Sequence, residues 1–342
     1  MLFFVNDYGK GAHKKVLEKI IESNDSVEFG YGFDSYSKSA KNKIREACGK
    51  EDAEIHFLSG GTQTNMIVIK SLLRSFEGVI AADSGHISVH EAGAIEHSGH
   101  KVIELKNYNG KLRAEDVKNY LETFHADSNK AHMVMPGMVY ISYPTEYGTL
   151  YSKKELEELY SLCKNYEIPL FIDGARLGYG LAADECDIDL PTLANLCDVF
   201  YIGGTKIGAL NGEAVVFSNK KYCPANFMTI IKQNGALLAK GRLLGAQFDA
   251  LFTDSLYFDI SKHAIEMANI LKKTLVEKGY RFYIESPTNQ QFIILENSKL
   301  EELEKKVKFA KWEKYDDNHT IIRFVTSWAT KKEEVEKLIE LL

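Results

Sequence analysis

Short apolar runs alternate with amphipathic stretches between residues 54 and 217. Seven of these runs have the length of a buried strand: residues 54–58, 79–82, 101–105, 132–143, 169–172, 198–202 and 214–217. Helical patterns lie between several of them, at residues 62–75, 113–125 and 152–166. The last pattern opens with the capping-box residues Ser152 and Glu155. Strands that alternate with helices predict an α/β fold, with a mostly parallel sheet covered by helices on both faces.

The pattern changes at about residue 243. A long helical stretch, residues 243–278, is followed by short apolar runs at 292–295, 308–314 and 320–326, and by a final helical pattern at 331–342. This order predicts a connecting helix and a smaller α+β domain. We therefore expect a large domain with an N-terminal segment over residues 1–242, and a second domain over residues 243–342.

Composition and charge exclude several classes of protein. The chain has 42 basic and 48 acidic side chains and a net charge of −6, so it lacks the basic footprint of a nucleic-acid or acidic-membrane binder. Its five cysteines are scattered without CxxC spacing, which indicates neither a disulfide framework nor a zinc site, and no other residues show metal-ligand spacing. With no signal-peptide pattern and no membrane-length apolar run, we expect a cytoplasmic protein.

Two of the predicted strands end in groups that carry chemistry. Asp173 follows the run at 169–172, and Lys206 follows the run at 198–202 through two glycines. Ligands of open α/β sheets bind outside the carboxyl ends of the strands, so both side chains are expected at one crevice. A lysine there has a lowered pKa and can attack a carbonyl group. A lysine Schiff base with an aspartate on the ring nitrogen is typical of pyridoxal phosphate (PLP) sites; a surface salt bridge is the alternative.

A third strand end offers a place for phosphate. Gly60, Gly61 and Thr62 lie between the run at 54–58 and the next helical pattern. Glycines allow close approach of a ligand, and the N–H groups at a helix start attract anions. The spacing is not GxGxxG, which argues against a dinucleotide site. His86 follows the next predicted strand and could lie flat against a pyridine ring.

Several segments, in this order, resemble the threonine aldolase family of fold-type I PLP enzymes, the aspartate aminotransferase superfamily. They are residues 59–65, 84–86, 91–93, 173–176, 203–206, 233–235 and 323–326. The resemblance runs from Asn6 to Arg323 and is close to the low-specificity L-threonine aldolases. It implies PLP-dependent cleavage of a β-hydroxy-α-amino acid, such as L-threonine or L-allo-threonine, to glycine and an aldehyde.

The resemblance also implies roles for individual residues around the cofactor. Lys206 is expected to hold PLP covalently, Asp173 to bind its ring nitrogen, and His86 to stack on its ring. The full set expected to bind the cofactor is Lys206, Asp173, Arg176, His86, Gly60, Gly61, Thr62 and Thr205.

On the substrate side, Arg323 resembles the arginine that binds the α-carboxylate, for which a planar bidentate donor is suited. Asn6 and Lys232 stand where family members carry other polar or basic substrate-side residues. Family members build shared active sites in dimers or tetramers, so we expect a homodimer or homotetramer. Tyr31 and Tyr36 are then candidates for reaching a neighbouring subunit's site; a packed loop is the alternative.

Two positions depart from the family pattern. Glu146 replaces a histidine that faces the substrate β-hydroxyl in many members, and His90 stands where a hydrophobic or aromatic residue is frequent. The catalytic base is therefore expected to be Glu146, His90, or a water between them. A carboxylate close to the cofactor and an arginine is expected to be ionised. These departures leave the preferred substrate open.

Two other readings compete with the aldolase. A β-eliminating lyase or an aminotransferase could use the same scaffold on another amino acid. A non-catalytic binding protein of this fold would show a decayed site, yet Lys206, Asp173 and Arg176 are all present.

Overall fold

The computed structural model describes residues 1–342 and contains a seven-stranded sheet. Its strands are β2 (Glu54–Leu58), β3 (Glu77–Ala82), β4 (Val102–Leu105), β5 (Met135–Ser142), β6 (Leu170–Asp173), β7 (Val199–Gly203) and β8 (Glu213–Phe217). Their order is β2-β8-β7-β6-β5-β3-β4, and β8 alone runs in the direction opposite to the other six strands. All seven predicted strand runs, and the mostly parallel α/β fold, are confirmed.

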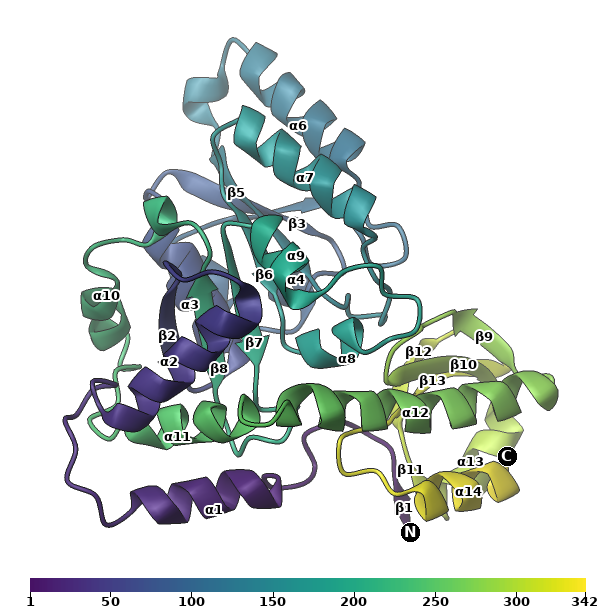
Figure 1. The fold of residues 1–342 in the computed structure, drawn as a ribbon. Coiled ribbons are helices and arrows are strands. Elements are labelled where there is room, and N and C mark those ends of the chain that lie inside the picture. Colours follow the sequence, from purple (N-terminus) through teal and green to yellow (C-terminus); the bar gives the residue numbers. More distant parts are fainter.

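Helices cover both faces of this sheet (Figure 1). The helices of this part of the chain are α1 (Lys14–Ser23), which packs on α11, α2 (Ser35–Cys48), α3 (Gly61–Leu72), α4 (His86–Val89), α5 (Ala94–His97), α6 (Ala114–Ala126), α7 (Lys153–Asn165), α8 (Leu177–Leu181), α9 (Leu190–Asn195), α10 (Phe227–Gln233) and α11 (Arg242–Leu251), with short 3₁₀ turns at Lys130–His132 and Lys220–Tyr222. Ile80 and Ile141 pack into the larger core on one face, and their neighbours Val79 and Tyr140 into the core on the other. This alternation explains why the strands read as continuous apolar runs.

A second sheet forms the C-terminal part of the molecule. The elements here are α12 (Leu256–Glu277), β9 (Arg281–Ile284), β10 (Gln290–Glu296), α13 (Asn297–Glu304), β11 (Val307–Lys308), β12 (Ala310–Lys314), β13 (His319–Val325) and α14 (Lys332–Leu341). The sheet is antiparallel in the order β12-β13-β10-β9, and α12 runs from the large sheet to this one (Figure 1). The first strand, β1 (Leu2–Phe3), pairs with β11, and Phe4 is buried in the C-terminal core. The domain boundary after residue 242 stays a prediction.

The predicted helix at residues 243–278 is wrong in one respect, because it is broken into α11 and α12. Asp254 and Ser255 between them have positive φ angles of 50° and 57°. Leu251 and Leu256 on the two sides of the break are both buried, so the apolar pattern continues across the turn and hides it. The run at 308–314 is divided between β11 and β12, and β9 was not predicted because its side chains are only partly buried.

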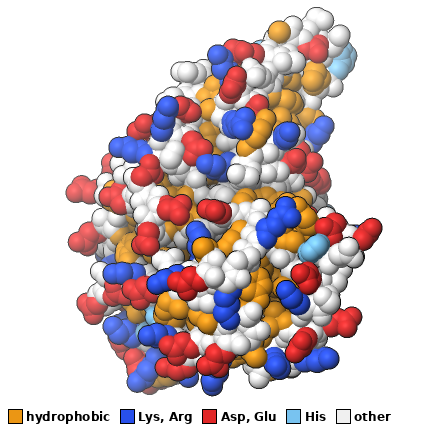
Figure 2. Space-filling view, turned by 90° about the vertical axis from the view of Figure 1, so that its right-hand side faces the viewer, with side chains coloured by type: hydrophobic (Ala, Val, Ile, Leu, Met, Phe, Trp, Pro, Cys, Tyr) orange, Lys and Arg blue, Asp and Glu red, His pale blue; other side chains and the backbone are white.

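The surface carries mixed charges. On the face shown in Figure 2, acidic and basic side chains are interspersed, with hydrophobic side chains between them. No helix combines the length and apolar character needed to cross a bilayer.

Candidate active site

Five loops that follow strands of the large sheet meet at one edge. Asp173 ends β6, and Lys206 lies in the turn after β7. His86 follows β3, Glu146 follows β5, and the N-terminus of α3 follows β2. Because these strands are parallel, their carboxyl ends share an edge of the sheet, where ligands of open α/β folds bind.

Asp173 is a buried carboxylate that accepts four hydrogen bonds. Its Oδ2 atom accepts hydrogen bonds from the Tyr140 hydroxyl at 2.7 Å and from Asn65 Nδ2 at 2.8 Å. Its Oδ1 atom accepts from the Tyr201 hydroxyl and the Ala175 N–H. Burial alone would raise the pKa of Asp173, but the charge of His86 and these hydrogen bonds outweigh it, so the pKa lies below its usual value. Asp173 is therefore suited to bind a cationic ring nitrogen.

A second buried acid, Glu91, orients His86. Its Oε1 atom lies 2.8 Å from His86 Nδ1 and accepts from Asn65 Nδ2 at 2.7 Å. The ligand atoms of His86, Glu91 and Asp173 lie within 4.8 Å of one another, a grouping that the sequence spacing did not indicate. The Asn65 amide lies between the two carboxylates and donates to both, so a hydrogen-bond donor links these acids.

The lysine of the predicted Schiff base lies in the same crevice. Burial lowers the pKa of Lys206, and the Arg176 cation lowers it further, against the attraction of nearby acids. A lowered pKa increases the neutral, nucleophilic fraction of the amine. Gly174 permits the close packing of this region, because a Cβ atom there would lie 1.9 Å from the Tyr201 carbonyl oxygen.

Arg176 is held by a buried ion pair with Asp7, from the N-terminal segment. Arg176 Nε lies 2.7 Å from Asp7 Oδ2, and its Nη2 lies 3.1 Å from Asp7 Oδ1. Asn289, ahead of β10, donates to the same carboxylate at 3.0 Å. Burial opposes ionisation of Asp7, but Arg176 and Lys206 bring its pKa below the usual value. This contact joins the N-terminal segment, the large sheet and the C-terminal sheet.

Arg323 enters the site from β13 in the C-terminal sheet. Its Nη1 donates to Gln290 at 2.9 Å, its guanidinium lies 4.9 Å from the ring centroid of Trp312, and its buried Nε has no hydrogen-bond partner. Burial, with the nearby Arg176 cation, lowers the pKa of Arg323 to about 10. A half-buried cation with an unused donor is suited to a carboxylate ligand.

Glu146 and His90, the two candidate bases, face the same cavity. Glu146 is buried, and its Oε1 accepts from the Ser142 hydroxyl at 2.6 Å and from the His86 N–H at 2.8 Å. Burial raises the pKa of Glu146. A raised pKa disfavours the ionised form, whereas the sequence predicted an ionised carboxylate here. Burial, with His86 and Arg323, lowers the pKa of His90. A lowered pKa favours the neutral imidazole ring of His90, which can accept a proton.

The start of α3 lies close to Asp173. Asn65 of α3 donates to Asp173, and a Cβ atom at Gly61 would lie 3.2 Å from the Tyr201 hydroxyl. Gly60, the N-cap residue, gives the helix no side-chain cap, and nothing lies within 4 Å of the position of a Cβ there. Thr62 is exposed beside it. The free N–H groups of the first helical turn therefore face open space, as an anion site requires.

These side chains surround a cavity of about 300 Å³, lined by Tyr8, His86, His90, Glu146, Arg176, Lys206, Trp312 and Arg323. A second cavity, of about 630 Å³, adjoins it and shares His90, Glu146, Trp312 and Arg323. The structure thus brings six of the predicted site residues to one cavity, with Asp173 behind them.

Four predicted site residues lie elsewhere in this single chain. Asn6 lines a separate cavity and accepts from the Tyr8 N–H at 3.1 Å. Lys232 lies over the Tyr31 ring at 4.9 Å, and Tyr36 is half-buried on α2. The Thr205 hydroxyl donates to Glu213 at 2.8 Å. The roles assigned to all of these residues stay predictions.

A family model for β-eliminating lyases matches residues 19–312. The chain belongs to the β-eliminating lyase family. A low-specificity L-threonine aldolase of a Pseudomonas species is 28% identical over 98% of this chain and 95% of its own length. The solved structure of Leishmania major threonine aldolase is 44% identical, with a TM-score of 0.96 over 100% of this chain and 98% of that one. The resemblance to threonine aldolases is confirmed.

An aspartate aminotransferase of Thermus thermophilus, 14% identical, covers 100% of this chain and 90% of its own, with a TM-score of 0.70. At 14% identity this similarity shows the fold alone. The fold is the fold-type I architecture that the sequence predicted.

Several residues of the site were not found from the sequence. Asn65, Glu91 and Glu213 are polar residues whose burial and hydrogen-bond partners are set by the fold. Tyr8 and Trp312 reach the cavity from the N-terminal segment and β12. Asn65 and Glu91 lie inside segments that resemble the family, which is the one signal that could have drawn attention to them.

Asp7→Asn tests the buried ion pair. Loss of one partner leaves the Arg176 cation uncompensated, so we expect the free energy of unfolding at pH 7 to fall by about 3 kcal/mol. Because the folded-state pKa of Asp7 is depressed, the pair stabilises the protein above the unfolded-state pKa and is lost as the pH falls through the folded-state value. The variant should therefore lose less stability than the wild type on acidification, measured by urea unfolding at several pH values.

Lys14→Ala is the control, because its pair with Glu18 is exposed at 3.5 Å. It should change the free energy of unfolding by less than about 0.5 kcal/mol. Equal effects of the two substitutions would show that Asp7 does not stabilise the fold through its charge.

Proposed function

We propose that this chain is a PLP-dependent aldehyde-lyase that cleaves a β-hydroxy-α-amino acid to glycine and an aldehyde. The observation that carries the proposal is the cavity between Lys206 and Arg323, with the buried carboxylate of Asp173 behind it. Similarity to threonine aldolases over nearly the whole chain supports the same activity. L-Threonine, L-allo-threonine or a related β-hydroxy amino acid is the proposed substrate.

The residues of the crevice fit PLP. Lys206 would hold its aldehyde carbon, Asp173 its ring nitrogen and His86 one face of its ring, while Gly60, Gly61 and Thr62 would hold its phosphate. The free N–H groups at the start of α3 and the open space beside Gly60 support the phosphate position. When bound, the cofactor supplies an electron sink for the electron pair of the broken Cα–Cβ bond.

The chain's own side chains would orient the substrate and move its proton. Arg323 binds the α-carboxylate through its unused donor, which fixes the orientation of the Cα–Cβ bond. Glu146 is the proposed acceptor of the β-hydroxyl proton. Both of its hydrogen bonds are made by Oε1, so Oε2 is available to the substrate. Asp173, whose lowered pKa favours the carboxylate, would hold a negative charge for the ring nitrogen.

Product analysis separates the aldolase from its rivals on the same scaffold. With threonine, allo-threonine, phenylserine and serine as substrates, we expect glycine and an aldehyde in equal amounts from at least one hydroxy amino acid. Lys206→Ala should lose both products and the borohydride-trapped cofactor, whereas Lys220→Ala, an exposed lysine, should keep them. Pyruvate with ammonia would instead identify a β-eliminating lyase, as the family description suggests, and amino-group exchange an aminotransferase.

Glu146→Gln tests the base. We expect kcat to fall by about 100-fold with little change in KM, because an amide cannot accept the hydroxyl proton. Since burial raises the pKa of Glu146, wild-type activity should decline on acidification at a higher pH than an ordinary carboxylate gives, and the variant should lack this decline. His90→Phe is the comparison. If it abolishes the pH dependence and Glu146→Gln does not, His90 is the base.

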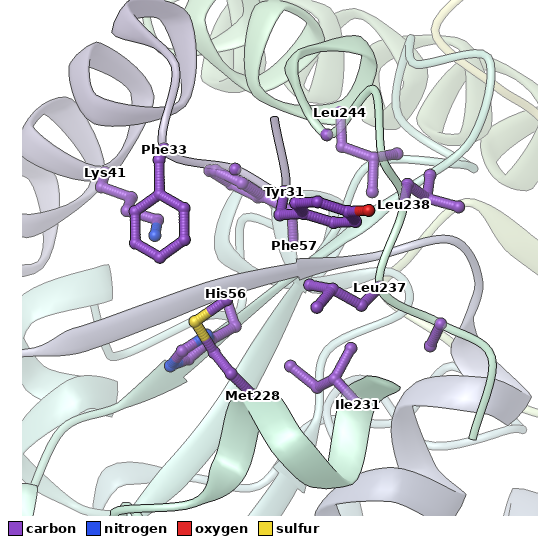
Figure 3. Close-up of a pocket in the computed structure, with 13 residues that line it drawn as sticks. Tyr31, Phe33, Lys41, His56, Phe57, Met228, Ile231, Leu237, Leu238 and Leu244 are labelled. Atoms are coloured by element: carbon purple, nitrogen blue, oxygen red, sulfur yellow. The ribbon is translucent and has the colours of Figure 1, made fainter. Parts of the chain in front are cut away.

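We also propose a homodimer or homotetramer with shared active sites. Segment 27–33 exposes apolar side chains, with Val27, Phe29 and Phe33 at 102%, 82% and 68% exposure. Tyr31, Phe33, Leu237 and Leu238 line a hollow of about 50 Å³. Figure 3 shows their side chains around it. Exposed apolar area of this kind marks interaction surfaces. Tyr31, Tyr36 and Lys232 lie outside this chain's own cavity, so another subunit's site is where they would act.

Phe29→Ser tests this surface. We expect sedimentation velocity to show a smaller assembly, because a large apolar contact is lost, while the fold is unaffected at so exposed a position. Phe76→Ser, at a 54% exposed position outside segment 27–33, is the matched control and should leave the assembly unchanged. A wild-type monomer at micromolar concentration would contradict the proposal.

A further inference from the structure

The turn that carries Lys206 is fastened to the sheet by a buried glutamate, Glu213, at the start of β8. Glu213 pairs with Gly203 in the β7–β8 ladder. Its Oε1 accepts from the Thr205 hydroxyl at 2.8 Å, and its Oε2 accepts from the Gly204 N–H at 3.2 Å. Glu213 is only 4% exposed, so both hydrogen bonds are shielded from water. The carboxylate thus binds the two residues directly before Lys206.

Other contacts close the turn on both sides. The Gly204 and Thr205 N–H groups donate to the Gly212 carbonyl at 2.9 and 3.1 Å, and the Thr205 hydroxyl accepts from the Gly212 N–H at 3.0 Å. The Tyr179 hydroxyl donates to the carbonyl of Lys206 itself at 2.6 Å. The Lys206 backbone is therefore held firmly, while its side chain lines the cavity.

We propose that Glu213 is a positioning residue for Lys206: its carboxyl group holds the Gly204–Thr205 part of the turn, and in its ionised form its negative charge favours the protonated lysine nitrogen. The inference rests on the proposed function, because it concerns the lysine that would carry the cofactor. It gives Glu213 a role in the reaction without contact to the cofactor or the substrate.

The charges around Glu213 support an electrostatic part in this role. Burial raises the pKa of Glu213 to about 8, and the Lys206 cation acts in the opposite direction. Glu213 in turn acts to raise the pKa of Lys206. Asp173 on β6, Tyr201 on β7 and Tyr257 on α12 are the other titratable groups that interact with Glu213. With a pKa of about 8, Glu213 is largely neutral below that pH and negatively charged above it, so its effect on Lys206 grows as the pH rises.

Glu213→Gln in the cofactor-loaded full chain tests the proposal. The readout is the absorbance of the lysine-linked cofactor as a function of pH, which reports protonation of the Lys206 nitrogen. We expect the midpoint to fall by about one pH unit, because the charge that favours the protonated nitrogen is lost. Glu213→Asp keeps the charge and should stay within about 0.3 pH units of the wild type.

Asp198→Asn is the matched control. Asp198 is also a buried acid with an N–H and a lysine as partners, but it lies at the opposite end of β7. It should lower stability and leave the absorbance midpoint unchanged. A midpoint in Glu213→Gln equal to that of the wild type, or an equal shift in Asp198→Asn, would overturn the proposal.

If Glu213→Gln does not fold, Thr205→Val decides the question. It removes a hydrogen bond that favours the Glu213 carboxylate, so the midpoint should move downward by a smaller amount, and an unchanged midpoint would overturn the proposal. A wild-type protein that shows no cofactor absorbance would contradict the proposed function itself. If instead the wild type shows normal cofactor absorbance and the variant shows the same midpoint, only the proposal for Glu213 is contradicted.

Discussion

The ionised state of Asp173 is the constraint on which the arrangement of the site depends. A carboxylate fully removed from water is tolerated only where donors replace its hydration. Here the donors come from Tyr140 on β5, Tyr201 on β7 and Asn65 on α3. The register of three adjacent strands and the start of α3 must all be correct for this one charge to be stable. The stability of the Asp173 charge therefore depends on the correct folding of the large sheet.

The second constraint is that the two arginines in the cavity have different partners. Arg176 is satisfied by Asp7 and Asn289, whereas Arg323 keeps a buried donor without a partner. One guanidinium thus serves to join the N-terminal segment to both sheets, and the other remains available for an anion. Because Arg323 and Trp312 come from the C-terminal sheet, the cavity exists only when that sheet is docked against the large one.

The sequence predicted the sheet, its strands and the central site residues because these are local patterns. A charged residue directly after a buried run marks a strand end wherever the strand lies. The turn at Asp254 and Ser255 escaped prediction because the apolar pattern continues through it. Glu91 and Glu213 escaped because a buried acid is recognised only by partners that the fold supplies. Asn6, Lys232 and Tyr36 were placed by family resemblance alone, and a single chain does not bring them to the cavity.

Burial and the neighbouring charges and hydrogen bonds together set the pKa values of the acids around the cavity. The acids are Asp7, Glu91, Glu146, Asp173 and Glu213, and the cations are Arg176, Lys206 and Arg323. Asp7 and Asp173 have charged or hydrogen-bonding partners that hold their pKa values low, whereas burial, with a smaller contribution from Asp173, raises the pKa of Glu146 and Glu213. Proton uptake at the two glutamates therefore limits the negative charge. Because Asp173 acts on both Glu146 and Glu213, a change at one of these three acids alters the protonation of the others, so they share the pH dependence of the site.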